Sequence, residues 1–514
     1  MRSYLITFCI LLQIFFVHSS SDASENAAEL QLLLKKGKEE IYHFRLENAI
    51  QTFQEVQNKF PGYPHGYFYE AYIYAILYSQ DRTNRDMDSL LQSSVRHALD
   101  IGDSYKKRYP LEPESSYYLG ATNGILAIYH VLNSSYIKGY IHGRRGKNYL
   151  QDAVALDSTY YDAYLGLGIF HYYVDLLPGI LKFFAGILGF HGDREHGMQE
   201  IRLTATQGQF FKIEGEFTFA VFRYFLEGDK QNSLQTFKKL HREYQDNPAL
   251  TLLIGYHYRR HGQITLAESY FRSVPEEFIG ILPQIIVMKY YNLGVCYYRL
   301  NQFEKADQYF NRLLDTSLRK SQYYQAAIAY YKGILAALQS KPEEADYYFQ
   351  MIYENKETQY WYNISRIHIE LPFDTVMRVF LEASNNVYSF QRKKAQPQVE
   401  WLVGQLEQDP RTYHQTSMEY LIRDLQARYY FQGGQVSEAK EIYELIIEDV
   451  NNFKDEFHRA WIYIAYARVL RELEEWSMSE SMLKKAGNTG DEYTLLIIER
   501  EKYILKNLQS HRKS

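Results

Sequence analysis

The pattern of apolar and polar positions in this chain is helical, and small and aromatic residues recur within it at one fixed period. Gly255, Gly294 and Gly333 are evenly spaced, and each is followed at a constant offset first by an alanine and then by a phenylalanine. No stretch alternates apolar and polar residues long enough to predict a sheet. This period predicts an array of helical repeats that presents a surface, rather than a compact catalytic domain.

The repeated positions predict how two helices pack within each unit. Small residues let the helices approach closely, and the aromatic residue fills the wedge next to the following unit. The register resembles the tetratricopeptide repeat, and the resemblance is carried most clearly by Tyr290, Leu293, Gly294, Tyr297, Ala306 and Phe310. The predicted repeat-packing residues are Gly168, Gly255, Ala267, Phe271, Gly294, Ala306, Phe310, Gly333, Ala345, Phe349 and Ala439.

The resemblance implies an all-α fold, a right-handed α-solenoid of stacked antiparallel helix pairs. Weaker copies of the pattern, such as Ala49 with Phe53, extend it over nearly the whole chain, which suggests about 11 pairs. Around the basic trio Arg392-Lys393-Lys394 the register is lost. The predicted organisation is a signal peptide over 1–22, an N-terminal array over 23–355, a divergent repeat or hinge over 356–415, and C-terminal repeats with a capping helix over 416–514.

One repeat contains an apolar insert. In the copy that begins near Gly168, the next small residue is expected at position 180 but is found only at Gly197, and the difference marks an insertion. The inserted stretch, 176–190, carries a single charge, and Pro and Gly within it oppose one long helix. We expect it to fold back as a buried helical hairpin. A ligand pocket or a membrane contact are the alternatives, and its main apolar groups are Leu176, Phe183, Phe184 and Phe190.

The N-terminus has the features of a secretory signal. Arg2 precedes a largely apolar run from Tyr4 to Val17, and small residues follow it. The run is shorter than the roughly 20 residues of a membrane-spanning helix. We therefore expect an exported protein of bacterial type that is periplasmic, associated with the envelope or secreted. After cleavage only Cys296 would remain, so no internal disulfide is expected.

Charge and motifs narrow the class of function. A formal net charge of −5 gives no reason to expect a nucleic-acid partner. The sequence shows no phosphate-binding loop, nucleophile elbow or Cys-x-x-Cys motif, so no catalytic residue or cofactor is predicted. His191, Asp193, Glu195 and His196 are potential metal ligands, but the spacing of the histidines does not place both on one helical face, and Asp193 suits a helix N-cap. No metal site is therefore predicted.

The resemblance also suggests where a partner would bind. In tetratricopeptide repeats the ligand contacts come from first-helix positions that face into the superhelix. By spacing, these are Tyr256, Arg259, Tyr291, Tyr298 and Tyr330. Such a face suits a protein or extended peptide, because it offers aromatic area and a guanidinium. The leading hypothesis is a non-catalytic exported scaffold. The alternative is an envelope accessory protein that binds or transports a small molecule or lipid through the insert, and the oligomeric state stays open.

Overall fold

Every regular element in the described part of the chain is a helix. The computed structural model describes residues 21–82, 84–175, 193–278, 282–314, 318, 320–408, 416–487 and 490–513, and these ranges contain no strand. No helix in them is long and apolar enough to cross a bilayer. The all-α prediction is confirmed. Residues 1–20 of the predicted signal peptide and the insert residues Leu176, Phe183, Phe184 and Phe190 lie outside the described residues.

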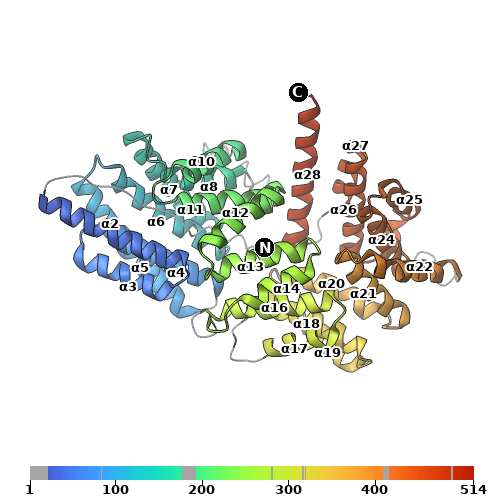
Figure 1. Ribbon diagram of the computed structural model, residues 1–514. Helices are drawn as coiled ribbons and strands as arrows, with labels where there is room; N and C mark the ends of the chain where they lie inside the picture. Colours follow the sequence, from blue (N-terminus) through green and yellow to red (C-terminus); the bar gives the residue numbers. More distant parts are fainter. Residues whose placement is uncertain are drawn as a thin grey trace. The chain divides into compact units, whose positions relative to one another are not determined.

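The chain divides into two units, and unit 1 comprises Met1–Leu250. Its consecutive helices stack side by side as antiparallel pairs (Figure 1). They are α2 (Ser21–Tyr42), α3 (Leu46–Lys59), α4 (His65–Gln80), α5 (Arg85–Arg108), α6 (Pro113–Leu132), α7 (Tyr136–Leu156), α8 (Ala163–Asp175), α10 (Arg194–Gln207), α11 (Lys212–Phe222) with the π-helical turn η1 (Arg223–Glu227), and α12 (Lys230–Glu243).

Unit 2 comprises Thr251–Ser514 and repeats the same arrangement. Its helices are α13 (Pro248–Arg260), α14 (Ile264–Ser273), α16 (Pro283–Arg299), α17 (Phe303–Leu313), α18 (Gln322–Leu338), α19 (Pro342–Gln350), α20 (Gln359–Glu370), α21 (Thr375–Tyr388), α22 (Arg392–Gln408), α24 (Ser417–Gln432), α25 (Val436–Ile447), α26 (Glu456–Glu472), α27 (Trp476–Lys485) and α28 (Glu492–Lys513). A 3₁₀ turn, η2 (Val450–Asn452), precedes α26.

The repeated small residues lie where the two helices of a pair cross. A Cβ atom added to Gly294 would come within 2.7 Å of the Phe310 ring, and Gly255 and Gly333 face the rings of Phe271 and Phe349 in the same way. The accompanying alanines Ala267, Ala306 and Ala345 are buried, and so is Ala439 in the later pair α24–α25. Each phenylalanine thus occupies the volume that a side chain on its partner glycine would need.

The turns between paired helices share one backbone conformation. Gly262, Asn301 and Ser340, which have the same even spacing as the repeat glycines, have φ values of +70°, +57° and +60°. A single left-handed residue at the end of a helix lets the chain reverse, while the next amide still bonds to a helix carbonyl. Gln302 N donates to Tyr297 O at 2.9 Å in this way. The repeat therefore fixes the turns as well as the helix crossings.

Unit 1 holds a buried polar cluster between α2, α11 and the start of α8. The Lys38 ammonium lies 3.3 Å from the Glu214 carboxylate, which also accepts a bond of 2.8 Å from the Tyr42 hydroxyl. Nearby, the Asp162 carboxylate accepts bonds from the Phe210 and Phe211 amides, at 3.3 and 3.0 Å. Burial raises the pKa of Asp162 to about 7. The cluster joins segments that are far apart in the sequence.

Candidate functional site

The predicted tyrosine face is covered by a later helix of the same unit. The Asn385 side chain on α21 donates to Tyr298 O at 2.9 Å, and the Tyr388 hydroxyl donates to Arg259 O at 3.0 Å. These carbonyl groups lie at the C-terminal ends of α16 and α13, where they also accept from the turn amides of Asn301 and Gly262. α21 therefore lies across the ends of helices that come much earlier in the chain.

The covering helix changes the role of the predicted binding residues. Tyr291, Tyr298 and Tyr330 are 3, 4 and 7% exposed, and Arg259 is buried with them. The Arg259 guanidinium lies 5.4 Å from the ring of the half-buried Tyr256, and the Tyr330 hydroxyl lies 3.3 Å from His368 Nε2. This corrects the expected exposure of the face. Because these aromatic side chains pack against α20 and α21, a partner cannot contact them in this conformation.

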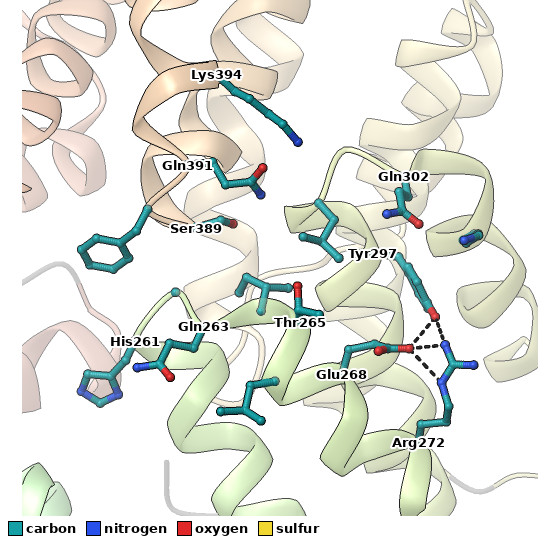
Figure 2. A pocket seen from close by; sticks show the side chains of 16 residues that line it. His261, Gln263, Thr265, Glu268, Arg272, Tyr297, Gln302, Ser389, Gln391 and Lys394 are labelled. Carbon is teal, nitrogen blue, oxygen red and sulfur yellow. Dashed lines mark hydrogen bonds and ion pairs between the residues drawn. The ribbon is translucent and has the colours of Figure 1, made fainter.

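An open groove lies beside the covered face. Its volume is about 880 Å³, and it lies between the turns 261–263 and 389–391 and the helices α14, α16 and α17 (Figure 2). Gly262 makes this arrangement feasible. Its φ is +70°, and an added Cβ would collide with both Tyr388 O and the Phe390 ring. A residue with a side chain here would be strained and would also push the second turn away.

One side of the groove carries a charge-balanced triad. The Tyr297 hydroxyl donates to Glu268 Oε1 at 2.7 Å, and Arg272 Nε donates to the same oxygen at 2.8 Å (Figure 2). Arg272 Nη2 also lies 2.5 Å from the Tyr297 hydroxyl. Burial, followed by the bond to Glu268, raises the pKa of Tyr297 above its usual range. Because the guanidinium neutralises the carboxylate, the triad adds little net charge to the groove.

Two lysines in the lining are left without an ion-pair partner among the described residues. Lys305 and Lys394 line the groove, and neither forms an ion pair with any residue that the structure describes. The Lys305 ammonium lies 5.5 Å from the centre of the Tyr297 ring, which leaves it able to bind an anion. Figure 2 shows the Lys394 side chain extending over the groove from α22. Since the triad is balanced, these two ammonium groups determine the sign of the local potential.

Amide and apolar side chains complete the groove. Gln263, Gln302 and Gln391 line it, and their side-chain amides bond to no described residue. An amide side chain can donate to a peptide carbonyl and accept from a peptide N–H. Leu266 and Phe390, which are 40% and 55% exposed, add apolar contact area. The groove thus offers anion binding, backbone hydrogen bonding and apolar contact within one surface.

Sequence spacing could not assemble this groove. Its lining comes from residues 261–305 and 389–394, which lie in different repeats. One feature of the sequence did point to this region: the basic trio that includes Lys394 lies where the repeat register is lost. In the predicted cluster of His191, Asp193, Glu195 and His196, the aspartate caps a helix. The Asp193 carboxylate accepts from His196 N at 2.9 Å as the N-cap of α10, while His191 lies outside the described residues.

Comparisons with known proteins agree with the repeat type. A family model described as Iml2/Tetratricopeptide repeat protein 39 matches residues 158–361, whereas a comparison with curated proteins finds no match. A solved tetratricopeptide repeat protein from Parabacteroides merdae ATCC 43184 is 17% identical, with a TM-score of 0.24, over 57% of this chain and 98% of its own. A chain of the APC/C hetero-tetramer Cut9-Hcn1 is 11% identical, with a TM-score of 0.25, over 90% of this chain and 88% of that chain. The family match and the helix pairs together show repeats of the tetratricopeptide type.

Proposed function

We propose that this protein is a non-catalytic scaffold that binds an extended acidic segment of a protein partner in the groove of unit 2. The observation that carries the proposal is the pair of unpaired ammonium groups, Lys305 and Lys394, beside three amide side chains that bond to no described residue. Stacked helical repeats typically serve as extended binding surfaces, and the family match supports that general role. The groove replaces the buried tyrosine face as the site of binding.

The lining specifies the chemistry of the partner segment. Acidic side chains would pair with Lys305 and Lys394, and an apolar side chain would contact Leu266 and Phe390. The amide side chains would bond to the peptide backbone and so favour an extended conformation. Charge-assisted hydrogen bonds are shorter and stronger than neutral ones, so the ammonium groups should dominate selectivity. Binding of this kind weakens as salt concentration rises.

The first test reverses one groove charge. Lys394→Glu should weaken binding of a labelled peptide of alternating Leu and Glu by about tenfold or more, because it removes a charge-assisted hydrogen bond and adds repulsion. Fluorescence anisotropy with the full chain measures the affinity. Lys393→Glu is the matched control, because it makes the same change at the adjacent position and does not line the groove. Equal affinities of the two variants would refute the proposed site, and a peptide of alternating Leu and Lys should bind weakly.

We also propose that the protein acts outside the cytoplasm, in the periplasm, at the envelope or as a secreted protein. The support is the apolar run from Tyr4 to Val17 with its preceding Arg2 and the small residues after it. Expression of the full gene in a bacterial host should yield a protein that has lost about its first 19 to 23 residues. Mass spectrometry of the mature N-terminus measures this, and a chain that retains Met1 would contradict export by cleavage.

A further inference from the structure

Two helices of unit 1 cross at backbone contact and bring three potential metal ligands together. An added Cβ on Gly168 of α8 would lie 2.5 Å from Gly197 O on α10. At this crossing His171 on α8 meets His196 and Glu200 on α10. One ligand atom from each residue lies within 4.8 Å of the other two. The close approach follows from the paired glycines, so the grouping is built into the core of the repeat.

The Glu200 carboxylate contacts both imidazole rings, whose centres are 5.3 Å apart. His171 Nδ1 is 2.6 Å from Glu200 Oε2, and His196 Nε2 is 3.3 Å from Glu200 Oε1. His196 and Glu200 are one helical turn apart on α10, which places them on the same face. The His196 side chain is 54% exposed, so the cluster has an open side toward solvent. A metal ion could therefore enter from solvent and keep a water molecule as a further ligand.

The surroundings leave the carboxylate without a permanent cation. Glu200 is buried, and within the described ranges its ion-pair partners are only the two imidazoles. Of the two arginines on α10, both within the described ranges, Arg194 is bonded to Glu227, and Arg202 forms no ion pair with Glu200. Burying a carboxylate is costly unless a positive charge compensates it. A divalent cation bound by these three residues would supply that charge.

We propose that His171, His196 and Glu200 bind a divalent transition-metal ion of the zinc class. Two imidazole nitrogens and one carboxylate oxygen form a donor set that zinc uses with water in a fourth position. The direct hydrogen bonds between Glu200 and the rings would be exchanged for bonds to the ion. The ion would then cross-link α8 to α10, the helices that precede and follow residues 176–192 in the sequence. This site is independent of the groove in unit 2.

The test measures Zn²⁺ and Co²⁺ binding to the untagged full chain after chelator treatment and dialysis. Isothermal titration with Zn²⁺ should show one saturable site, and Co²⁺ should give the visible absorption of a site with nitrogen and oxygen ligands. His196→Ala and Glu200→Gln should each lower Zn²⁺ affinity by about a hundredfold or more. His196 is exposed, so its replacement should leave the thermal midpoint of the metal-free protein unchanged. Zn²⁺ should raise that midpoint in the parent and not in His196→Ala.

His142→Ala is the matched control. His142 stacks on His130 in the same unit with ring centres 5.2 Å apart, and its ring bonds to the Asn123 amide oxygen rather than to a carboxylate. This variant should keep the Zn²⁺ affinity of the parent. The proposal would be overturned if the parent chain showed no saturable binding of Zn²⁺ or Co²⁺, or if His196→Ala bound Zn²⁺ as tightly as the parent. Either result would leave the three residues as a structural ion-pair cluster.

Discussion

Glu214→Ala should lower the free energy of unfolding of unit 1 by about 3–5 kcal/mol, the usual cost of removing one partner from a buried ion pair. Glu214 is 2% exposed and accepts from both Lys38 and the Tyr42 hydroxyl. Without it, the Lys38 ammonium would stay buried 4.2 Å from the centre of the Phe211 ring with no carboxylate bonded to it. Urea denaturation of the full chain at neutral pH, followed by circular dichroism, measures the change.

The pKa directions of the pair agree with this cost. Burial raises the pKa of Glu214 and lowers the pKa of Lys38, so each charged form is costly in this environment. Within the pair, each charge offsets the burial cost of the other. The triple variant Lys38→Met, Tyr42→Phe, Glu214→Leu removes all three polar ends together. It should be far more stable than Glu214→Ala, since buried ion pairs can be replaced by apolar residues with little loss.

An ion pair with one exposed partner, on the same helix, provides the control. Glu216 on α11 bonds to Lys239 at 2.6 Å, and the Lys239 side chain is mostly exposed. Glu216→Ala should change the stability by less than about 1 kcal/mol, because solvent screens such a pair. If Glu214→Ala unfolded at the same urea concentration as Glu216→Ala, the buried pair would not hold unit 1 together. If the triple variant were as unstable as Glu214→Ala, packing rather than the unpaired charge would explain the loss.

The helix pairs were predictable because their determinants are local. The glycine and the phenylalanine of one repeat, such as Gly294 and Phe310, meet across one turn, so a single repeat contains both partners. The same register reaches unit 1, where an added Cβ on Gly37 would lie 2.5 Å from the Phe53 ring. The sequence pattern identified Ala49 and Phe53 but passed over Gly37, which precedes Ala49 by the offset that separates glycine from alanine in the clear repeats. Extending the spacing by one step would have found it.

The covering helix and the groove were not predictable in this way. Asn385 is fully buried, yet an asparagine in a helical pattern usually indicates a solvent-facing position. Its partner Tyr298 O is 87 residues away, and no period relates the two positions. Tyrosine is equally ambiguous, because it fills helix interfaces and also lines binding surfaces. Only the return of α21 over α16 decides that Tyr298 is a packing residue.

The cluster of His171, His196 and Glu200 was only partly visible in the sequence. Sequence spacing paired Gly168 with Gly197 across the insert, and their close contact in the structure has the same register. In a strictly antiparallel crossing that pairing sets His171 opposite Arg194, three residues before Gly197, so the contact of His171 with Glu200 at 2.6 Å is seen only in the structure. The density of histidine and carboxylate residues along the chain indicates His191 and His196 and gives no sign of His171. Neither the glycine spacing nor the local density of histidine identifies all three residues of this cluster.

Gly168→Leu should destabilise unit 1 by about 3 kcal/mol or more, at the upper end of the range for overpacking a core. The atoms that a Cβ would meet are Gly197 O at 2.5 Å, Ile201 Cγ1 at 2.8 Å and Ile201 N at 2.9 Å, and the first and last of these belong to the backbone of α10. Backbone atoms cannot rotate away as a side chain can. The larger residue can be accommodated only if α8 and α10 separate, which would remove packing along the whole crossing.

Gly124→Ala on α6 is the control for the change in helix propensity. Nothing lies within 4 Å of a Cβ built at Gly124, so alanine there should stabilise the helix by about 0.5–1 kcal/mol. Urea denaturation of both variants gives the comparison. A Gly168→Leu protein that unfolds at the parent's midpoint would contradict the close crossing of α8 and α10. If the crossing opens as expected, His171 moves away from Glu200, and Gly168→Leu should also lose any Zn²⁺ binding that the parent shows.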